Sequence, residues 1–504
     1  ASDVYKRQTY TAVRYRHPAT GEAVVSIVGE ALAGIVMRAV GVEDYETCGS
    51  VKGERLAALT YRHPFMERVC PVLTAGYVSV TEGTGCVHTA PGHGQEDYLT
   101  GLEHNLDILS PVDENGYFTD EAGVFAGQRI TEGDEAICAH LMEGGYLLHR
   151  GSSVHSYPHC WRCREPVIFR ATEQWFVRMD HRELRQRALS AVSRTEWAPA
   201  WGEQRMRQMI AERPDWCISR QRSWGVPIPA FYCRNCGKAL LDADVAERVA
   251  QVFGERGSDS WFEDEGTDLF LPEGTRCECG AADWEKESDI LDVWFESGSS
   301  HNSVCRKRAD LAFPADLYLE GVDQYRGWFQ LSLMPSLAAW DEAPFKGVLI
   351  HGFVVDEDGK KMSKSLGNFI SVADGIERFR AEILRLWCSS IDFQDQIRVS
   401  EDYLRKGMVD AYRRVRNTFR FLLGNTADFD PARHSAPYDR MREMDRWALD
   451  ELARLVKRVE QAWESYELHQ VYGSIHNFCA VTMSSTYLDA LKDRLYCSGA
   501  DWPE

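Results

Sequence analysis

Residues 318–329 read Tyr318-Leu319-Glu320-Gly321-Val322-Asp323-Gln324-Tyr325-Arg326-Gly327-Trp328-Phe329. They follow a predicted strand and open a predicted helix, which is where an open α/β sheet binds its ligands, at the carboxyl ends of the strands. Glu320, Asp323 and Gln324 can hydrogen-bond an amino group and ribose hydroxyls, and Trp328 can form one wall of an apolar side-chain pocket. An acid and an aromatic residue near a helix start are also compatible with a helix cap and core packing.

A basic loop is predicted further along the chain at Lys361-Met362-Ser363-Lys364-Ser365, followed by Leu366-Gly367-Asn368. The Gly/Asp-rich turn Asp356–Gly359 precedes it, and His351-Gly352-Phe353 lies upstream of that turn. Two lysines separated by small polar residues on a loop can close over a triphosphate and neutralise its charge during nucleotidyl transfer. For a bare lysine pair, the alternative is a solvated basic loop.

Both segments resemble those of a known enzyme family. Residues 361–365 match KMSKS, the second signature of class I aminoacyl-tRNA synthetases, and residues 318–329 resemble the aminoacyl-adenylate site of the isoleucyl-tRNA synthetases. Pro158–Phe176, Trp216–Pro229 and Asp292–His301 are similar to the same family. The resemblance implies ATP-dependent activation of isoleucine, with Mg²⁺-bound ATP as the substrate, and transfer of isoleucine to tRNA(Ile).

The resemblance also implies which residues form the synthetic site. Lysine side chains would stabilise the pentavalent phosphate, and the residues after the predicted strand would hold the adenylate. The implied catalytic residues are Lys361, Ser363, Lys364 and Ser365. The implied adenylate and ATP contacts are Glu320, Gly321, Asp323, Gln324, Trp328, His351, Gly352 and Lys364.

A second, hydrolytic site is expected in the first part of the chain. Isoleucine exceeds valine by one methylene, which is worth only about 1–3 kcal/mol in an apolar pocket, a limit for which the isoleucyl enzymes are the standard example. Residues Gly83–Tyr98 resemble the editing motif of this family. The resemblance implies that Asp97 anchors the α-amino group of mischarged valine, that His88 lies beside the ester bond and that Thr84 contributes to the site.

Six of the fifteen cysteines fall in tight pairs, which favours metal binding over disulfides in a long chain of this kind. Cys233-x-x-Cys236 and Cys277-x-Cys279 supply four thiolates, enough for a closed tetrahedral structural zinc site. Free thiols remain the alternative. Cys160-x-x-Cys163 is only half a site, and we expect it to be free of metal.

The chain has 504 residues, which predicts about two to four packed domains in a multidomain α/β protein. Residues 1–155 alternate short β-rich runs, such as Ala23–Val28 and Gly76–Val80, and we expect a partial editing domain there. Residues 156–398 are expected to form the second half of a Rossmann-like catalytic domain with a zinc-type insertion at about 230–285. Residues 399–504 would begin a helical anticodon-binding domain, with Ser400 as a helix N-cap and Asp445–Glu464 as a helix.

The net charge of −20 argues against indiscriminate nucleic-acid binding, although a local basic surface can still contact RNA. Such a surface is predicted on the helix that carries Arg405, Lys406, Arg413, Arg414, Arg416 and Arg420. Solvated charge is the alternative for such a helix. No stretch has the roughly 18 uninterrupted apolar residues of a membrane helix, so we expect a cytoplasmic monomer without a membrane partner.

The first class I signature, HIGH, does not occur in the sequence, and neither does the Thr-rich strand that completes the family's editing pocket. We therefore expect the chain to be a fragment lacking the N-terminal HIGH segment and the C-terminal end, and to activate isoleucine poorly by itself. Three alternatives stay open: a valyl or leucyl synthetase, a stand-alone hydrolase of mischarged tRNA, and a non-catalytic RNA-binding module.

Overall fold

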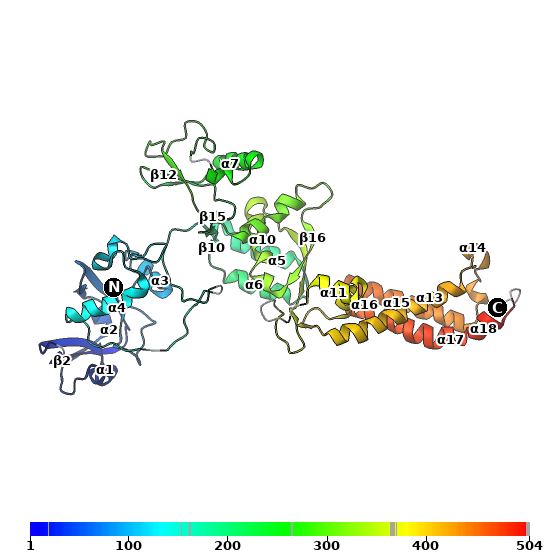
Figure 1. The fold of residues 1–504 in the computed structure, drawn as a ribbon, viewed down its shortest axis with the longest axis horizontal. Coiled ribbons are helices and arrows are strands. Elements are labelled where there is room, and N and C mark those ends of the chain that lie inside the picture. Colours follow the sequence, from blue (N-terminus) through cyan, green and yellow to red (C-terminus); the bar gives the residue numbers. More distant parts are fainter. Residues whose placement is uncertain are drawn as a thin grey trace. The chain divides into compact units, whose positions relative to one another are not determined.

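The computed structural model (Figure 1) describes residues 1–18, 20–152, 154–160, 163–263, 266–362, 368 and 370–499. Its contacts divide the chain into two compact units, Ala1–Glu173 and Gln174–Glu504. Both units combine helices and sheets, which confirms the predicted α/β multidomain class. The domain limits expected at 155 and 398 stay predictions, because the division by contacts follows Glu173 instead.

The first unit contains an antiparallel sheet in which β2 (Thr9–Arg16) lies between β3 (Ala23–Gly29) and β4 (Glu46–Lys52). Along β2, Val13 and Tyr15 are buried while Arg14 and Arg16 are exposed, the alternation that a strand with one covered face requires. Helix α1 (Ala33–Val40) packs in the same core through Val36 and Met37. The predicted strand at residues 23–28 is confirmed.

A four-stranded sheet follows in the same unit, with the order β5-β6-β1-β7. Its strands are β5 (Thr60–Arg62), β6 (Val69–Thr74), β1 (Ser2–Val4) and β7 (Cys86–His88). The expected strand at Gly76–Val80 is wrong, because the chain turns at Gly76 and Tyr77 directly after β6 and the Tyr77 hydroxyl donates to the buried carboxylate of Asp3. The helices α2 (Gly53–Leu56), α3 (Gln95–Glu103) and α4 (Ile130–Glu143) give this unit more helix than expected.

The second unit is built around a parallel sheet of the order β16-β17-β9, formed by Ala315–Gly321, Phe345–His351 and Glu196–Ala198. Helices α5 (Leu184–Arg194), α6 (Gly202–Ala211) and α10 (Trp328–Trp340) supply apolar side chains to one core with these strands. Helix α10 buries residues on all sides, as expected for a helix inside a domain. The strand predicted before residue 318 is present, although it runs on to Gly321, and the predicted helix opens at Trp328.

A small module interrupts this fold. Strand β12 (Phe231–Cys233) pairs with β13 (Ala239–Leu240) and β14 (Trp284–Lys286), and helices α7 (Ala243–Arg256) and α8 (Ser260–Glu263) follow β13. The module has its own apolar core. Two short ladders lie at its base, β8 (Phe176–Val177) with β10 (Trp216–Cys217) and β11 (Ser219–Arg220) with β15 (Ile290–Leu291).

A buried carboxylate joins the module to the α/β body. Glu287 is 8% exposed and accepts hydrogen bonds from Trp175 Nε1 at 2.7 Å and from the Tyr232 hydroxyl at 2.8 Å. It also accepts from the backbone N–H groups of Ser288 and Asp289, at 2.7 and 2.9 Å. Burial opposes ionisation of Glu287, but these four donors outweigh burial and hold its pKa below the usual value.

Beyond the sheet, the two-residue strands β18 (Val354–Val355) and β19 (Ile397–Arg398) pair in parallel, and α11 (Val372–Phe379) and α12 (Ala381–Ser390) lie between them in the chain. A helical bundle follows. Its main elements are η7 (Tyr403–Met408), α13 (Val409–Asn425), α15 (Glu443–Glu464), α16 (Leu468–Asn477) and η9 (Phe478–Tyr487), with the short helices α14 (Pro431–His434), α17 (Leu488–Ala490) and α18 (Lys492–Cys497). Ser400 Oγ accepts from Tyr403 N at 3.1 Å, which confirms the predicted N-cap. None of the helices among the described residues combines the length and apolarity needed to cross a membrane.

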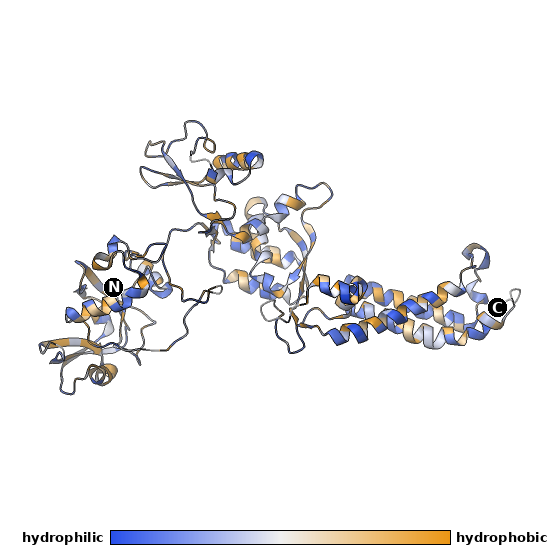
Figure 2. Cartoon of the chain, viewed as in Figure 1, coloured by the Kyte–Doolittle hydropathy of each residue, from blue (hydrophilic) through white to orange (hydrophobic). Residues whose placement is uncertain are grey.

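The predicted helix at 445–464 is confirmed as α15, but its packing face is not the one that the largest apolar side chains suggest. Small or medium side chains at seven-residue spacing, Ala448, Leu455 and Ala462, are the buried residues of α15. Leu449, Leu452, Val456 and Trp463 are exposed. Figure 2 shows hydrophobic and hydrophilic residues interleaved along this bundle.

The end of the bundle contains a part-buried ion pair that we expect to contribute to stability. Both guanidinium NH groups of Arg494 lie 3.1–3.3 Å from the Asp445 carboxylate, which also accepts from the Tyr487 hydroxyl at 2.9 Å. Asp445→Ala should lower the free energy of unfolding by about 1–3 kcal/mol, because it leaves two part-buried donors without an acceptor. Urea unfolding measures this change. Asp450→Ala, which removes an exposed pair with Arg454, is the control and should cost less than about 1 kcal/mol.

Candidate functional site

The carboxyl ends of β16 and β17 bring four of the predicted site residues together. The register pairs Gly321 with His351, and a methyl group at Gly321 would lie 2.8 Å from the Asp323 carboxylate and 3.4 Å from the His351 ring. Glu320 and Asp323 are exposed at this edge. Carboxylates, an imidazole and a closely packed glycine therefore meet at the edge of the sheet where ligands of α/β proteins bind.

Trp328 is fixed beside this edge by three contacts. Its ring stacks on Tyr318 with centroids 4.0 Å apart and planes 5° from parallel, and its Nε1 donates to the carbonyl of Ser297 at 3.0 Å. The side-chain oxygen of Gln324 accepts from Trp328 N at 2.9 Å and so caps helix α10. Burial raises the pKa of Tyr318 to about 12, so this residue stays a neutral platform. Trp328 is half-buried, which leaves part of its ring open to a ligand.

Helix α9 (Val293–Gly298) supplies the carbonyl that holds the Trp328 indole. Asp292 caps α9 by accepting from Trp294 N at 3.2 Å, and it also receives Arg220 at 2.7 Å. At the other end of α9, a methyl group at Gly298 would lie 1.9 Å from the carbonyl oxygen of Leu331. Helix α9 therefore approaches α10 more closely than any residue larger than glycine would allow at position 298.

Gly298→Ala should therefore push α9 away from α10 and carry the Ser297 carbonyl off the Trp328 indole. We expect the free energy of unfolding to fall by about 1–3 kcal/mol, as for other overpacked contacts. Urea unfolding measures this change. Gly254→Ala, in an exposed helical position with open space around it, is the matched control and should not lower the free energy of unfolding.

The loop after β17 carries the first of the two predicted lysines. Gly352 has no room for a side chain, since a methyl group there would lie 1.8 Å from the carbonyl oxygen of Asp395. The backbone of Lys361 forms an isolated antiparallel β-bridge with Val355, and the Lys361 Nζ lies 4.6 Å from the centroid of the Phe353 ring. Lys361 is thus held against Phe353, which lies two residues after His351 in the chain. Ser363, Lys364 and Ser365 lie outside the described residues.

Asp356 closes the turn that leads to this loop. Its carboxylate accepts from Asn368 Nδ2 at 2.8 Å and from Lys360 N at 2.8 Å. These hydrogen bonds lower the pKa of Asp356, the Asn368 contact first. The residues before and after the lysine segment are therefore tied together at one carboxylate, which brings the ends of the loop together.

Four cysteines of the small module converge. The sulfur atoms of Cys233, Cys236, Cys277 and Cys279 all lie within 4.8 Å of one another. Cys233 and Cys279 are 3.6 Å apart, and Cys236 and Cys277 are 3.5 Å apart. A zinc–sulfur bond of about 2.3 Å implies about 3.8 Å between the sulfurs of a tetrahedral site, so this donor set fits zinc. Asn235 Nδ2, 3.6 Å from Cys279 Sγ, can stabilise a thiolate.

The predicted editing residues lie close together in the first unit. Asp97, in the first turn of α3, accepts from Ala90 N at 3.0 Å, and His88 ends β7. The atoms around the ring of His88 remove part of its hydration and lower its pKa, an effect that Asp97 partly offsets. The Thr84 hydroxyl bonds to the backbone of Cys86 in its own turn. The Thr84 hydroxyl is therefore occupied by hydrogen bonds to the backbone of Cys86.

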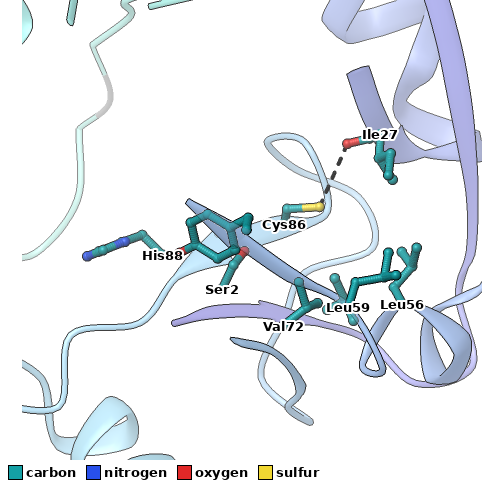
Figure 3. Close-up of a pocket in the computed structure, with 9 residues that line it drawn as sticks. Ser2, Ile27, Leu56, Leu59, Val72, Cys86 and His88 are labelled. Atoms are coloured by element: carbon teal, nitrogen blue, oxygen red, sulfur yellow. Dashed lines mark hydrogen bonds between the residues drawn. The ribbon is translucent and has the colours of Figure 1, made fainter. Parts of the chain in front are cut away.

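His88 lies at the rim of two hollows. One is an apolar hollow of about 340 Å³ lined by Leu56, Leu59 and Val72, and Figure 3 shows the His88 imidazole extending away from those side chains. The other is a cavity of about 390 Å³ whose wall includes His63, Phe65, His88 and His93. Asp97 does not line either hollow among the described residues.

Comparison with known proteins decides the family. Residues 13–400 match the tRNA synthetases class I (I, L, M and V), and residues 445–502 match the anticodon-binding domain of tRNA ligase. The chain belongs to the class I tRNA synthetases. Its relatives include the Isoleucine--tRNA ligases of Petrotoga mobilis, Moorella thermoacetica and Syntrophotalea carbinolica. The chain is 49% identical to the first over 475 residues, 50% identical to the second over 469 residues and 50% identical to the third over 483 residues. These alignments cover 93–96% of this chain but only 50–52% of each relative, so the chain spans about half the length of the curated relatives it matches.

In this class I synthetase chain, the basic helix predicted from the sequence is only partly available to RNA. Arg405, Lys406 and Arg414 pair with acids one helical turn earlier, at 3.1, 2.7 and 3.0 Å. Arg413, Arg416 and Arg420 are exposed, as are Tyr412 and Phe419. The charge on this helix is thus divided between local ion pairs and an open stripe.

Sequence reasoning missed three residues of this candidate site. Asp292, Trp294 and Ser297 lie on or beside α9, and a methyl group at Gly327 would touch the Trp294 ring at 3.1 Å. The stretch 292–301 resembles the family, but nothing in it marks a backbone carbonyl as the partner of an indole. Its Asp-x-Trp start does predict a helix cap, which is the one signal that the sequence offered.

Proposed function

We propose that the chain is the part of an isoleucine–tRNA ligase that holds the aminoacyl-adenylate and closes over ATP. The observation that supports this most is the meeting of Gly321, Asp323 and His351 at one sheet edge, with Lys361 held against Phe353. The relatives that resemble the chain along nearly its full length are Isoleucine--tRNA ligases. We further propose that the protein acts as a cytoplasmic monomer.

In the proposed reaction, the carboxylate of isoleucine attacks the α-phosphate of Mg²⁺-bound ATP, and pyrophosphate leaves. The terminal hydroxyl of tRNA(Ile) then takes the acyl group and releases AMP. Lys361 and Lys364 would stabilise charge on the phosphates, and Ser363 and Ser365 would shape their loop. Reaction by this route needs no nucleophile from the protein.

The adenylate would lie along the sheet edge. Glu320 and Asp323 would hold the amino group and ribose hydroxyls, and the exposed part of Trp328 would bound the isoleucine side chain. Gln324 would act through the helix cap that positions Trp328, and its amide lies 3.3 Å from the Asp323 carboxylate. His351 and Gly352 would lie beside the nucleotide, because they lie at and directly after the carboxyl end of β17.

Two further sites belong to this proposal. The Cys233–Cys236–Cys277–Cys279 cluster would bind a structural zinc ion, which supplies folding energy to the module. His88 and Asp97 would take part in removing valine from mischarged tRNA, with Asp97 holding the amino group and His88 beside the ester bond.

Amino-acid-dependent exchange between pyrophosphate and ATP tests the function. We expect the 504-residue chain alone to be nearly inactive, and robust isoleucine-dependent exchange by it would contradict that expectation. When the chain is joined to the segments of the relatives that it does not cover, isoleucine should support exchange about 100-fold better than valine, the discrimination that one methylene permits. A preference for valine, leucine or methionine would overturn the proposed function.

A further inference from the structure

Trp224 is the most exposed large apolar side chain among the described residues of the second unit, at 88%. Exposed apolar side chains are common singly, but an indole is the most costly of them to leave in water, because it has the largest area to bury. No described residue makes a hydrogen bond or ring contact with it. Its neighbour Arg222 is also exposed and pairs with no acid among the described residues.

The loop that carries Trp224 is held rigidly on both sides. Gln221 Nε2 donates to the Asp289 carboxylate at 2.7 Å, and Val226 N donates to Glu296 Oε1 at 3.1 Å. Leu291 N donates back to Val226 O at 2.7 Å, and Gly225 lies directly against Ile290. The indole is therefore presented to solvent by an ordered loop, and binding to it costs little conformational entropy.

The anchors also place this loop beside the synthetic site. Glu296, which holds Val226, belongs to α9, and the next residue, Ser297, holds the Trp328 indole. Trp294 of the same helix lies against Gly327. Trp224 is thus presented one short helix away from the residues that would bind the adenylate.

The chemistry of the loop favours an unpaired nucleotide as its partner. An aliphatic amino acid needs an enclosed pocket, and Trp328 already supplies a half-buried wall for one. A free indole face with an unpaired guanidinium two residues away matches a planar base and a neighbouring phosphate, as in proteins that bind single-stranded nucleic acid.

We propose that Trp224 stacks on the unpaired 3′-terminal base of the tRNA and that Arg222 binds a phosphate of the same strand. This inference rests on the proposed function, because acyl transfer requires that end of the tRNA to reach the Glu320–Trp328 edge. It adds a recognition element outside the residues that touch the adenylate.

A binding cycle with the 504-residue chain tests the proposal. Fluorescence anisotropy gives the dissociation constants of two labelled tRNA(Ile) transcripts, one complete and one lacking the terminal adenosine. Removing that adenosine should weaken binding to the unaltered chain roughly tenfold, the value of one stacked base. Trp224→Ala should bind the complete transcript roughly tenfold more weakly and should no longer distinguish the two transcripts, whereas Trp224→Phe should keep most of the difference.

The controls separate stacking from folding and from general RNA binding. Trp463→Ala removes another exposed indole of the same unit and should still distinguish the transcripts. Thermal unfolding of Trp224→Ala should match that of the unaltered chain. Arg222→Ala should lower the slope of log affinity against log salt by about one.

Three results would overturn the inference: no tRNA binding by the chain, equal binding of both transcripts by the unaltered chain, or a Trp224→Ala variant that still distinguishes them. None of these depends on which amino acid drives exchange. Conversely, a terminal-base effect at Trp224 combined with valine-dependent exchange would retain the inference and remove the isoleucine assignment.

Discussion

Lys361→Ala is expected to slow isoleucine activation by roughly 10²–10³-fold, because it removes one preorganised charge from the transition state of the phosphate. The KM for isoleucine should change little, since the amino acid would lie against Trp328 and the β16 edge. Exchange of pyrophosphate with ATP, measured in the chain joined to the segments of its relatives that it lacks, separates the two parameters. Lys364→Ala should have a similar effect.

The neighbouring lysine provides the control for this prediction. Lys360 is exposed on the same turn, and its backbone N–H, which a substitution keeps, is the group that bonds to Asp356. Lys360→Ala should therefore stay within about twofold of the unaltered enzyme, as expected for a screened surface charge. Equal activity of the Lys361 and Lys360 variants would remove Lys361 from the catalytic assignment.

The second large effect is expected at the cysteine cluster. Cys277→Ser should abolish zinc binding and unfold the 230–285 module. Structural zinc sites contribute on the order of 10–16 kcal/mol of binding free energy to folding, and the variant would lose this contribution. Elemental analysis should find about one zinc ion per unaltered chain and none in the variant. Limited proteolysis should then cut the variant inside the module while the β16–β17 core stays protected.

A matched cysteine serves as the control. Cys388 is exposed in the same unit and lies outside the cluster, so Cys388→Ser should keep zinc and resist proteolysis. Purified unaltered chain that contains no zinc and remains folded would contradict the zinc proposal, as would a Cys277→Ser variant that still binds the metal.

The sequence predicted those parts of the structure in which local pattern and tertiary packing agree. Strand β16 and helix α10 were predictable because apolar runs flank a polar turn, and the cysteine cluster followed from spacing alone. The strand expected at Gly76–Val80 failed because Tyr77 satisfies a buried carboxylate instead of joining a ladder. On α15, helical spacing was right, but the buried face is the one that carries Ala448, Leu455 and Ala462.

The candidate site was predictable only where a side chain carries the chemistry. Glu320, Asp323 and Lys361 could be selected by residue type and position. The Ser297 carbonyl and the close approach at Gly298 could not, because they depend on backbone atoms brought together by α9 and α10. Residues 292–301 resemble the synthetase family, but that resemblance implied no role for them.

Glu287 has a consequence for any attempt to graft the 230–285 insertion onto another synthetase. Its donors come from both sides of the junction, Trp175 from the body and Tyr232 from the insertion. A transplant cut at residues 230 and 285 would carry Tyr232 into the host but not Glu287, so the hydroxyl would arrive without its acceptor. Boundaries that transfer Trp175, Tyr232 and residues 287–289 as one set would keep all four hydrogen bonds of Glu287.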